Sequence, residues 1–169
     1  TIQNQMSAIM NHACRFYGLS VNPCDKPGKM GKAKAKEMLF WTKEEYLKFS
    51  ESMKEKPVSF YAFEVLYWCG IREGELLALN RGDVDLEKRR LCIDKSLQVI
   101  RGKEYITPPK TDKSNRNIEL PQFLCDELED YFGMLYKCDE STRLFPVSKS
   151  YLHHEVDRGV RETGVKRIR

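Results

Sequence analysis

The sequence contains no apolar run of the length that a membrane-spanning helix needs, about 18 to 20 residues. It also lacks the basic, apolar and small-residue pattern of a secretory signal at its N-terminus. These two absences predict a protein that is neither membrane-spanning nor exported, and we expect it in the cytoplasm.

The sequence has six cysteines, but no two of them form a Cys-x-x-Cys pair. Zinc ribbons and fingers need closely spaced ligand pairs, so we expect no structural metal site. With 41% hydrophobic and 32% charged residues, the 169-residue chain has the composition of a folded globular protein. Its 29 basic residues outnumber its 25 acidic residues, a formal charge of +4 that permits a polyanionic partner without requiring one.

The first part of the chain differs in composition from the rest. Apolar residues between Ile2 and Ala13 recur at helical spacing, which predicts a helix over residues 1–17. Turn-forming residues and five lysines between Lys26 and Lys36 follow. We therefore expect a helix plus basic linker in residues 1–36 and a compact domain in residues 37–169.

The compact domain is expected to be mainly helical, an α+β fold with a small three-stranded antiparallel sheet. Thr42 and Glu45 form a capping-box pattern, and Pro57 suits the first turn of the next helix. Leu91, Ile93, Leu97 and Val99 share one parity, as a half-buried strand requires. Expected elements are helices beginning at about Thr42, Pro57, Arg72, Pro121 and Ser148, and strands over residues 91–99, 104–107 and 116–120.

Residues 69–79 carry the first candidate site. Arg72 follows a glycine turn and opens a short helix, and Glu75 lies on the same helical face, where its carboxylate can hold the guanidinium. An arginine fixed in this way is suited to binding a phosphate group. An ordinary ion pair at the start of a surface helix has the same spacing, so spacing alone leaves both interpretations open.

Together with their neighbours, these residues resemble the tyrosine recombinase (phage integrase) family. Residues 70–79 (GIREGELLAL) are similar to the first arginine box of that family, and residues 80–85 (NRGDVD) to its continuation into a small sheet. Residues 107–118 (TPPKTDKSNRNI) resemble its β-hairpin lysine motif. The resemblance covers about residues 40–169 and includes the order of helices and strands. Residues 1–36 resemble the tail of the family's core-binding domain and its linker.

The resemblance implies a site-specific DNA recombinase, the integrase of a phage or integrative element. Such enzymes cut and rejoin DNA through a phosphotyrosyl intermediate and use no metal or nucleotide cofactor. By motif position, Arg72 is the first catalytic arginine, Lys110 is the general acid, and Glu75 supports Arg72. Lys113 is the second candidate for the general acid.

The same resemblance implies double-stranded DNA, with its attachment sites, as the partner, and a homotetramer of the full-length protein on that DNA. Basic residues of the linker and of the lysine motif are suited to contact the DNA backbone. The candidate DNA-binding residues are Lys29, Lys32, Lys34, Lys113 and Arg116.

The sequence departs from the family at its C-terminal end. The His-x-x-Arg box and the nucleophilic tyrosine would follow Arg169, and none of the eight tyrosines matches the nucleophile. His12 and Arg15 fit the His-x-x-Arg pattern but lie upstream, in the predicted first helix. We therefore expect a truncated catalytic domain that is inactive alone. The alternatives are a non-catalytic DNA-binding module and a helical interaction domain with no role on DNA.

Overall fold

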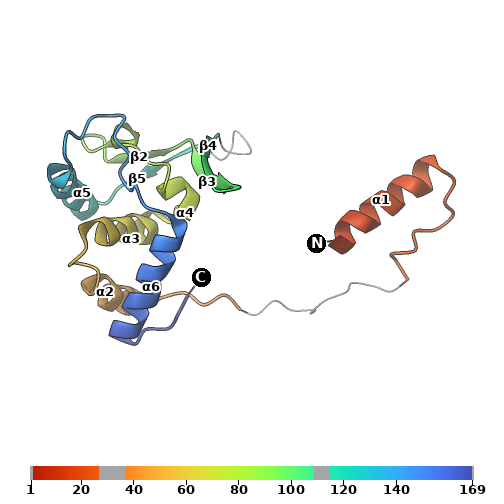
Figure 1. Ribbon diagram of the computed structural model, residues 1–169, viewed down its shortest axis with the longest axis horizontal. Coiled ribbons are helices and arrows are strands. Elements are labelled where there is room, and N and C mark those ends of the chain that lie inside the picture. Colours follow the sequence, from red (N-terminus) through yellow and green to blue (C-terminus); the bar gives the residue numbers. More distant parts are fainter. Residues whose placement is uncertain (1, 27–36, 109–114, 169) are drawn as a thin grey trace. The chain divides into compact units, whose positions relative to one another are not determined.

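The computed structural model describes residues 2–26, 37–108 and 115–168, and the chain divides into two units, Thr1–Met38 and Leu39–Arg169 (Figure 1). The first unit contains helix α1 (Ile2–Phe16), none of whose residues is buried. The side-chain amide of Asn22 ties the following loop back to this helix, because it donates to the Asn11 side chain at 2.9 Å and to Ser7 at 3.1 Å. Within the described ranges, no helix has both the length and the apolarity needed to cross a membrane.

The second unit begins with helices whose ends follow local sequence signals. The Thr42 hydroxyl accepts from the Glu45 amide and the Glu45 carboxylate accepts from the Thr42 amide, which confirms the capping box at the start of α2 (Lys43–Glu51). Pro57 is the first residue of α3 (Pro57–Cys69), as predicted. Gly70 ends α3 in the left-handed conformation with φ 59°, which glycine adopts at no steric cost.

Helix α3 is charged at one position only, and that charge is buried. The Glu64 carboxylate accepts hydrogen bonds from Tyr46 (2.8 Å), Ser50 (2.5 Å) and Trp68 (2.7 Å). Three donors compensate for the desolvation of the carboxylate. The network joins α3 to α2, and it fixes the helix whose end presents the candidate site.

The chain next forms two small sheets. After a 3₁₀ turn, η1 (Arg81–Asp83), strands β1 (Val84–Asp85), β2 (Arg90–Ile93) and β5 (Arg116–Glu119) form an antiparallel sheet in the order β1-β2-β5. Strands β3 (Ser96–Ile100) and β4 (Lys103–Thr107) pair with each other as a hairpin. The α+β fold with a three-stranded antiparallel sheet is thus confirmed.

The prediction of a single strand over residues 91–99 is wrong. The chain leaves the first sheet at Asp94 and Lys95, and residues before and after this point belong to different sheets. Lys95 forms an ion pair with Asp83 at 2.6 Å, which holds the bend against the preceding turn. Leu97 remains buried after the bend, whereas Val99 is exposed. The alternation of apolar residues in the sequence continues through residues 94 and 95, so it gives no sign of the break between the two strands.

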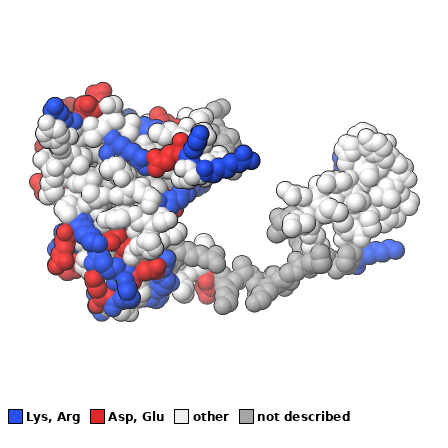
Figure 2. Space-filling view, in the orientation of Figure 1, with Lys and Arg blue, Asp and Glu red and all other residues white. Residues whose placement is uncertain are grey.

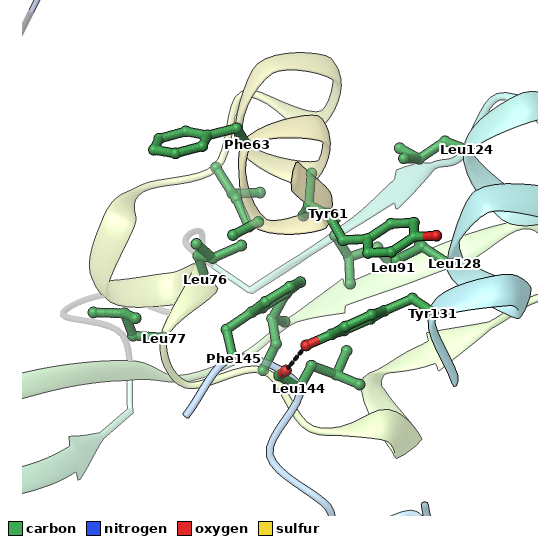
Figure 3. Packing of buried hydrophobic residues seen from close by; sticks show 14 of the residues in the cluster. Tyr61, Phe63, Leu76, Leu77, Leu91, Leu124, Leu128, Tyr131, Leu144 and Phe145 are labelled. Carbon is green, nitrogen blue, oxygen red and sulfur yellow. Dashed lines mark hydrogen bonds between the residues drawn. The ribbon is translucent and has the colours of Figure 1, made fainter. Parts of the chain in front are cut away.

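Helices α5 (Gln122–Met134) and α6 (Lys149–Thr163) complete the unit. Leu124, Leu128 and Tyr131 of α5 are buried in the core, and the Tyr131 hydroxyl donates to the Leu144 carbonyl at 2.6 Å (Figure 3). Helix α4 (Glu73–Leu76) has only four residues, and Asn80, four residues further on, pairs with Arg143 in an isolated bridge.

Candidate functional site

The end of α3 places Arg72 at the surface on a fixed backbone. Ile71 is buried, whereas about three-quarters of the Arg72 side chain is exposed (76%). The Arg72 amide donates to Glu75 Oε2 at 2.9 Å, so the carboxylate caps the start of α4. The guanidinium of Arg72 is therefore presented to solvent from a backbone that packing and capping both hold.

The Glu75 carboxylate is saturated with hydrogen bonds. Its Oε1 accepts from Arg72 Nη1 at 2.9 Å and from Arg116 Nη1 at 3.1 Å. Its Oε2 accepts from the Arg72 amide at 2.9 Å and from Arg116 Nη2 at 2.7 Å. A carboxylate has about four acceptor sites, and all four are occupied here. We refer to Arg72, Glu75 and Arg116 as the arginine cluster.

The charge of Glu75 is stabilised despite its burial. Burial raises the pKa of this carboxyl, but hydrogen bonds from Arg116 and Arg72 outweigh it and lower the pKa to about 2. The pairing with Glu75 in turn raises the pKa of Arg116. At neutral pH the cluster therefore holds two guanidinium groups and one carboxylate, and its net charge is positive.

Helix α4 also packs closely against the hairpin. A Cβ on Gly74 would lie 2.7 Å from Ser96 Oγ and 3.0 Å from the Leu97 carbonyl, so any larger residue would push α4 away from β3. Arg116 reaches the cluster from the start of β5, where it pairs with the buried Ile93 of β2. Three elements far apart in sequence thus converge at the arginine cluster.

The structure brings together only part of the predicted site. Arg72 and Glu75 form the expected ion pair at 2.9 Å. Lys110, Lys113, Lys29, Lys32 and Lys34 lie outside the described residues. Arg116, predicted as a DNA contact, has its guanidinium on Glu75, an arrangement that sequence reasoning missed. Its shared parity with Ile118 of β5 and with Leu120 just after the strand was the available signal, because that parity marks the face turned toward the core.

An apolar cavity of about 450 Å³ lies beside the site, and its lining includes Ile71, Leu152 and Val156. Glu73, which follows Arg72, contributes to this lining together with His153, whose Nε2 lies 3.2 Å from the Glu73 carboxylate. Arg72 does not line the cavity. The exposed member of the cluster is the Arg72 guanidinium, a setting that suits a large anionic partner better than an enclosed small molecule.

Basic side chains gather on the hairpin near its turn. Figure 2 shows Lys and Arg side chains over the β3–β4 hairpin, where Arg101 and Lys103 are exposed, and a mixture of both charges along α6. Within residues 2–26, 37–108 and 115–168, no three His, Cys, Asp or Glu side chains gather to hold a metal ion.

Comparisons with known proteins find relatives of this sequence. The chain is 32% identical over 129 residues to the ICEBs1 integrase of Bacillus subtilis, covering 76% of this chain and 35% of the relative. It is 26% identical over 144 residues to a XerC-like tyrosine recombinase of Caldanaerobacter subterraneus, covering 77% of this chain and 37% of the relative. No family model matches the sequence.

The fold is shared with a solved recombinase. The Tn1549 transposon integrase in complex with transposon right end DNA superposes with a TM-score of 0.74 over 99% of this chain and 59% of that one, at 17% identity. The resemblance predicted from the sequence is thus confirmed: this chain is a relative of the integrases and tyrosine recombinases and has their fold. It spans little more than a third of the length of the curated relatives it matches, 35% and 37%.

Proposed function

We propose that this chain is the N-terminal part of the catalytic domain of a site-specific DNA recombinase, the integrase of a phage or integrative element, preceded by the end of a core-binding domain and a basic linker. The observation that carries the proposal is the arginine cluster, in which an exposed guanidinium is held on a buried carboxylate. Sequence relatives named integrase and tyrosine recombinase support it.

In the proposed reaction, a tyrosine of the full-length enzyme attacks the scissile phosphodiester of duplex DNA. A bond forms between the tyrosine oxygen and phosphorus, and the bond from phosphorus to the 5′-oxygen breaks. Arg72 binds the nonbridging oxygens, on which negative charge grows in the transition state. Lys110 gives a proton to the departing 5′-oxygen, a role in which Lys113 is the alternative. The reaction requires no metal or nucleotide cofactor.

The proposed DNA-binding residues also include basic residues that lie outside the described ranges. Lys113 and the linker lysines Lys29, Lys32 and Lys34 contribute phosphate contacts that do not depend on base sequence. We further propose that the full-length protein acts on attachment-site DNA as a homotetramer in the cytoplasm.

Binding of the 169-residue chain to a fluorescent 30-base-pair duplex, measured by anisotropy at several salt concentrations, tests this function. We expect binding that weakens as salt rises, with Arg72→Gln reducing the slope of log K against log salt by about 1. Lys88→Gln is the control, because Lys88 is exposed and pairs with Asp85, away from the cluster. Absence of binding by the unmodified chain at low salt would refute a role on DNA.

Covalent chemistry is tested separately with a nicked suicide substrate that carries an attachment site. The 169-residue chain should give no protein–DNA adduct, since none of its tyrosines matches the family nucleophile. A covalent adduct would show that one of these tyrosines is the nucleophile and would overturn the assignment.

A further inference from the structure

We propose that Arg116 is a positioning residue for Arg72: through Glu75 it keeps the arginine cluster cationic and holds the Arg72 guanidinium in place for a phosphate. This inference rests on the function proposed above and assigns Arg116 a role other than the direct DNA contact expected from its sequence position. Its basis is the shared carboxylate, which Arg116 approaches from β5, 41 residues away in sequence.

The first argument is electrostatic. Glu75 alone would neutralise Arg72, and a neutral pair has little attraction for a phosphate diester. Arg116 adds a second positive charge to the same carboxylate, so the cluster as a whole carries a net positive charge. Because Glu75 is 5% exposed, solvent screens this charge balance less than it would at an open surface.

The second argument is geometric. Arg116 donates from both terminal nitrogens to the two carboxylate oxygens, at 3.1 and 2.7 Å, an end-on bidentate pair. This pair fixes the plane of the carboxylate. The orientation of the Glu75 oxygen that accepts from Arg72 is therefore fixed, and this restricts the rotamers that the Arg72 side chain can adopt while it keeps that hydrogen bond.

The third argument is the difference in exposure between the two arginines. The Arg72 side chain is 76% exposed and the Arg116 side chain 33%. The outer guanidinium is thus accessible to a polymer, while the inner one faces the carboxylate. This division suits a contacting residue supported by a positioning residue.

The direct test is nuclear magnetic resonance of the 169-residue chain without DNA. In Arg116→Gln, the pKa of the Glu75 carboxyl should rise by about 1 unit or more, and the Arg72 Nε–Hε group should become more mobile on the nanosecond timescale. In Arg116→Lys the charge is kept and the bidentate pair is lost, so the Glu75 pKa should rise less while Arg72 still loosens. An unchanged Arg72 signal in both variants would overturn the proposal.

Binding to the fluorescent duplex supplies the functional test, as a double-mutant cycle. Arg72→Gln and Arg116→Gln should each weaken binding about fivefold, and the double variant should be little weaker than Arg72→Gln alone. Full additivity would show that Arg116 acts independently of Arg72 and would overturn the positioning role.

The matched control is Arg90→Gln, which removes one positive charge from an exposed residue at the opposite end of the same β2–β5 pairing. It should change binding by less than twofold and leave the Arg72 signal unchanged. An effect of Arg90→Gln as large as that of Arg116→Gln would reduce the role of Arg116 to net charge and would overturn the proposal. If the unmodified chain does not bind DNA, the proposed function fails. The magnetic resonance measurement on the Arg116 variants needs no DNA and still tests the positioning of Arg72.

Discussion

Arg116 of β5 and Glu75 of α4 form a bidentate ion pair, with N–O distances of 3.1 and 2.7 Å, although 41 residues separate them. The same carboxylate also holds Arg72, the residue that the family resemblance identifies as the first catalytic arginine. The candidate site is therefore a tertiary structure that joins a helix to a sheet, and its integrity depends on both.

The acid stability of the chain should depend on Glu75. The folded-state pKa of about 2 lies below the ordinary value of 4.5, so the stabilisation is fully present above about pH 4.5 and is lost as pH falls toward 2. Glu75→Gln removes this stabilisation and should lower the free energy of unfolding by about 2 to 3 kcal/mol at pH 6. Urea unfolding of both proteins between pH 2 and 6 measures this difference.

The two unfolding curves should converge near pH 2, where about half of the wild-type carboxyl is protonated even in the folded state. Glu119→Gln is the matched control, because Glu119 lies on β5 and its side chain is 80% exposed. A stability difference between wild type and Glu75→Gln that stays constant from pH 6 to pH 2 would contradict the charge assignment.

Glu127 should have the opposite pH dependence. Burial and the nearby Glu64 raise the pKa of the Glu127 carboxyl to about 7, and its Oε2 is buried without a hydrogen-bond partner among the described residues. An acid with a raised folded-state pKa loses stability as pH rises from about 4.5 through 7, because ionisation is then easier in the unfolded chain. Glu127→Gln should therefore stabilise the protein by about 1 to 3 kcal/mol at pH 8.

At pH 4 the same Glu127→Gln substitution should have little effect, because the wild-type carboxyl is then protonated in the folded state. Thermal unfolding at the two pH values measures the contrast. An equal effect at pH 4 and pH 8 would show that this carboxyl does not titrate as proposed.

The crossing of α6 over α2 should depend on the absence of a side chain at Gly159. A Cβ there would lie 2.4 Å from Phe49 Cε2 and 2.6 Å from Met53 Cε, inside the core. Gly159→Ala should lower the free energy of unfolding by about 1 to 3 kcal/mol. Gly133→Ala in α5 is the control, since a Cβ there meets nothing within 4 Å and should add about 0.5 to 1 kcal/mol of helix stability. Chemical denaturation of the two variants should give changes of opposite sign.

The features that could be predicted from the sequence are those set by neighbouring residues. The capping box at Thr42 and the proline at the start of α3 both depend on residues within one turn. The family resemblance has the same origin, because each of its motifs is a continuous segment.

The features that could not be predicted depend on distant partners. The apolar parity of residues 91–99 continues through Lys95, and the bend becomes evident only when Asp83 is found as its ion-pair partner. The pairing of Arg116 with Glu75 likewise needs the sheet and α4 in place. The division of the chain at residue 36 and the roles of Lys110 and the linker lysines stay predictions.

The proposed function requires that the Arg72 guanidinium contacts a backbone phosphate of bound duplex DNA. Its most direct test is the Arg72 Nε–Hε resonance of the 169-residue chain, followed while duplex DNA is added at low salt. We predict that this resonance shifts and that its exchange with water slows as the complex forms. Saturation of the chain with DNA while the Arg72 resonance keeps its position and exchange rate would contradict a phosphate contact by Arg72.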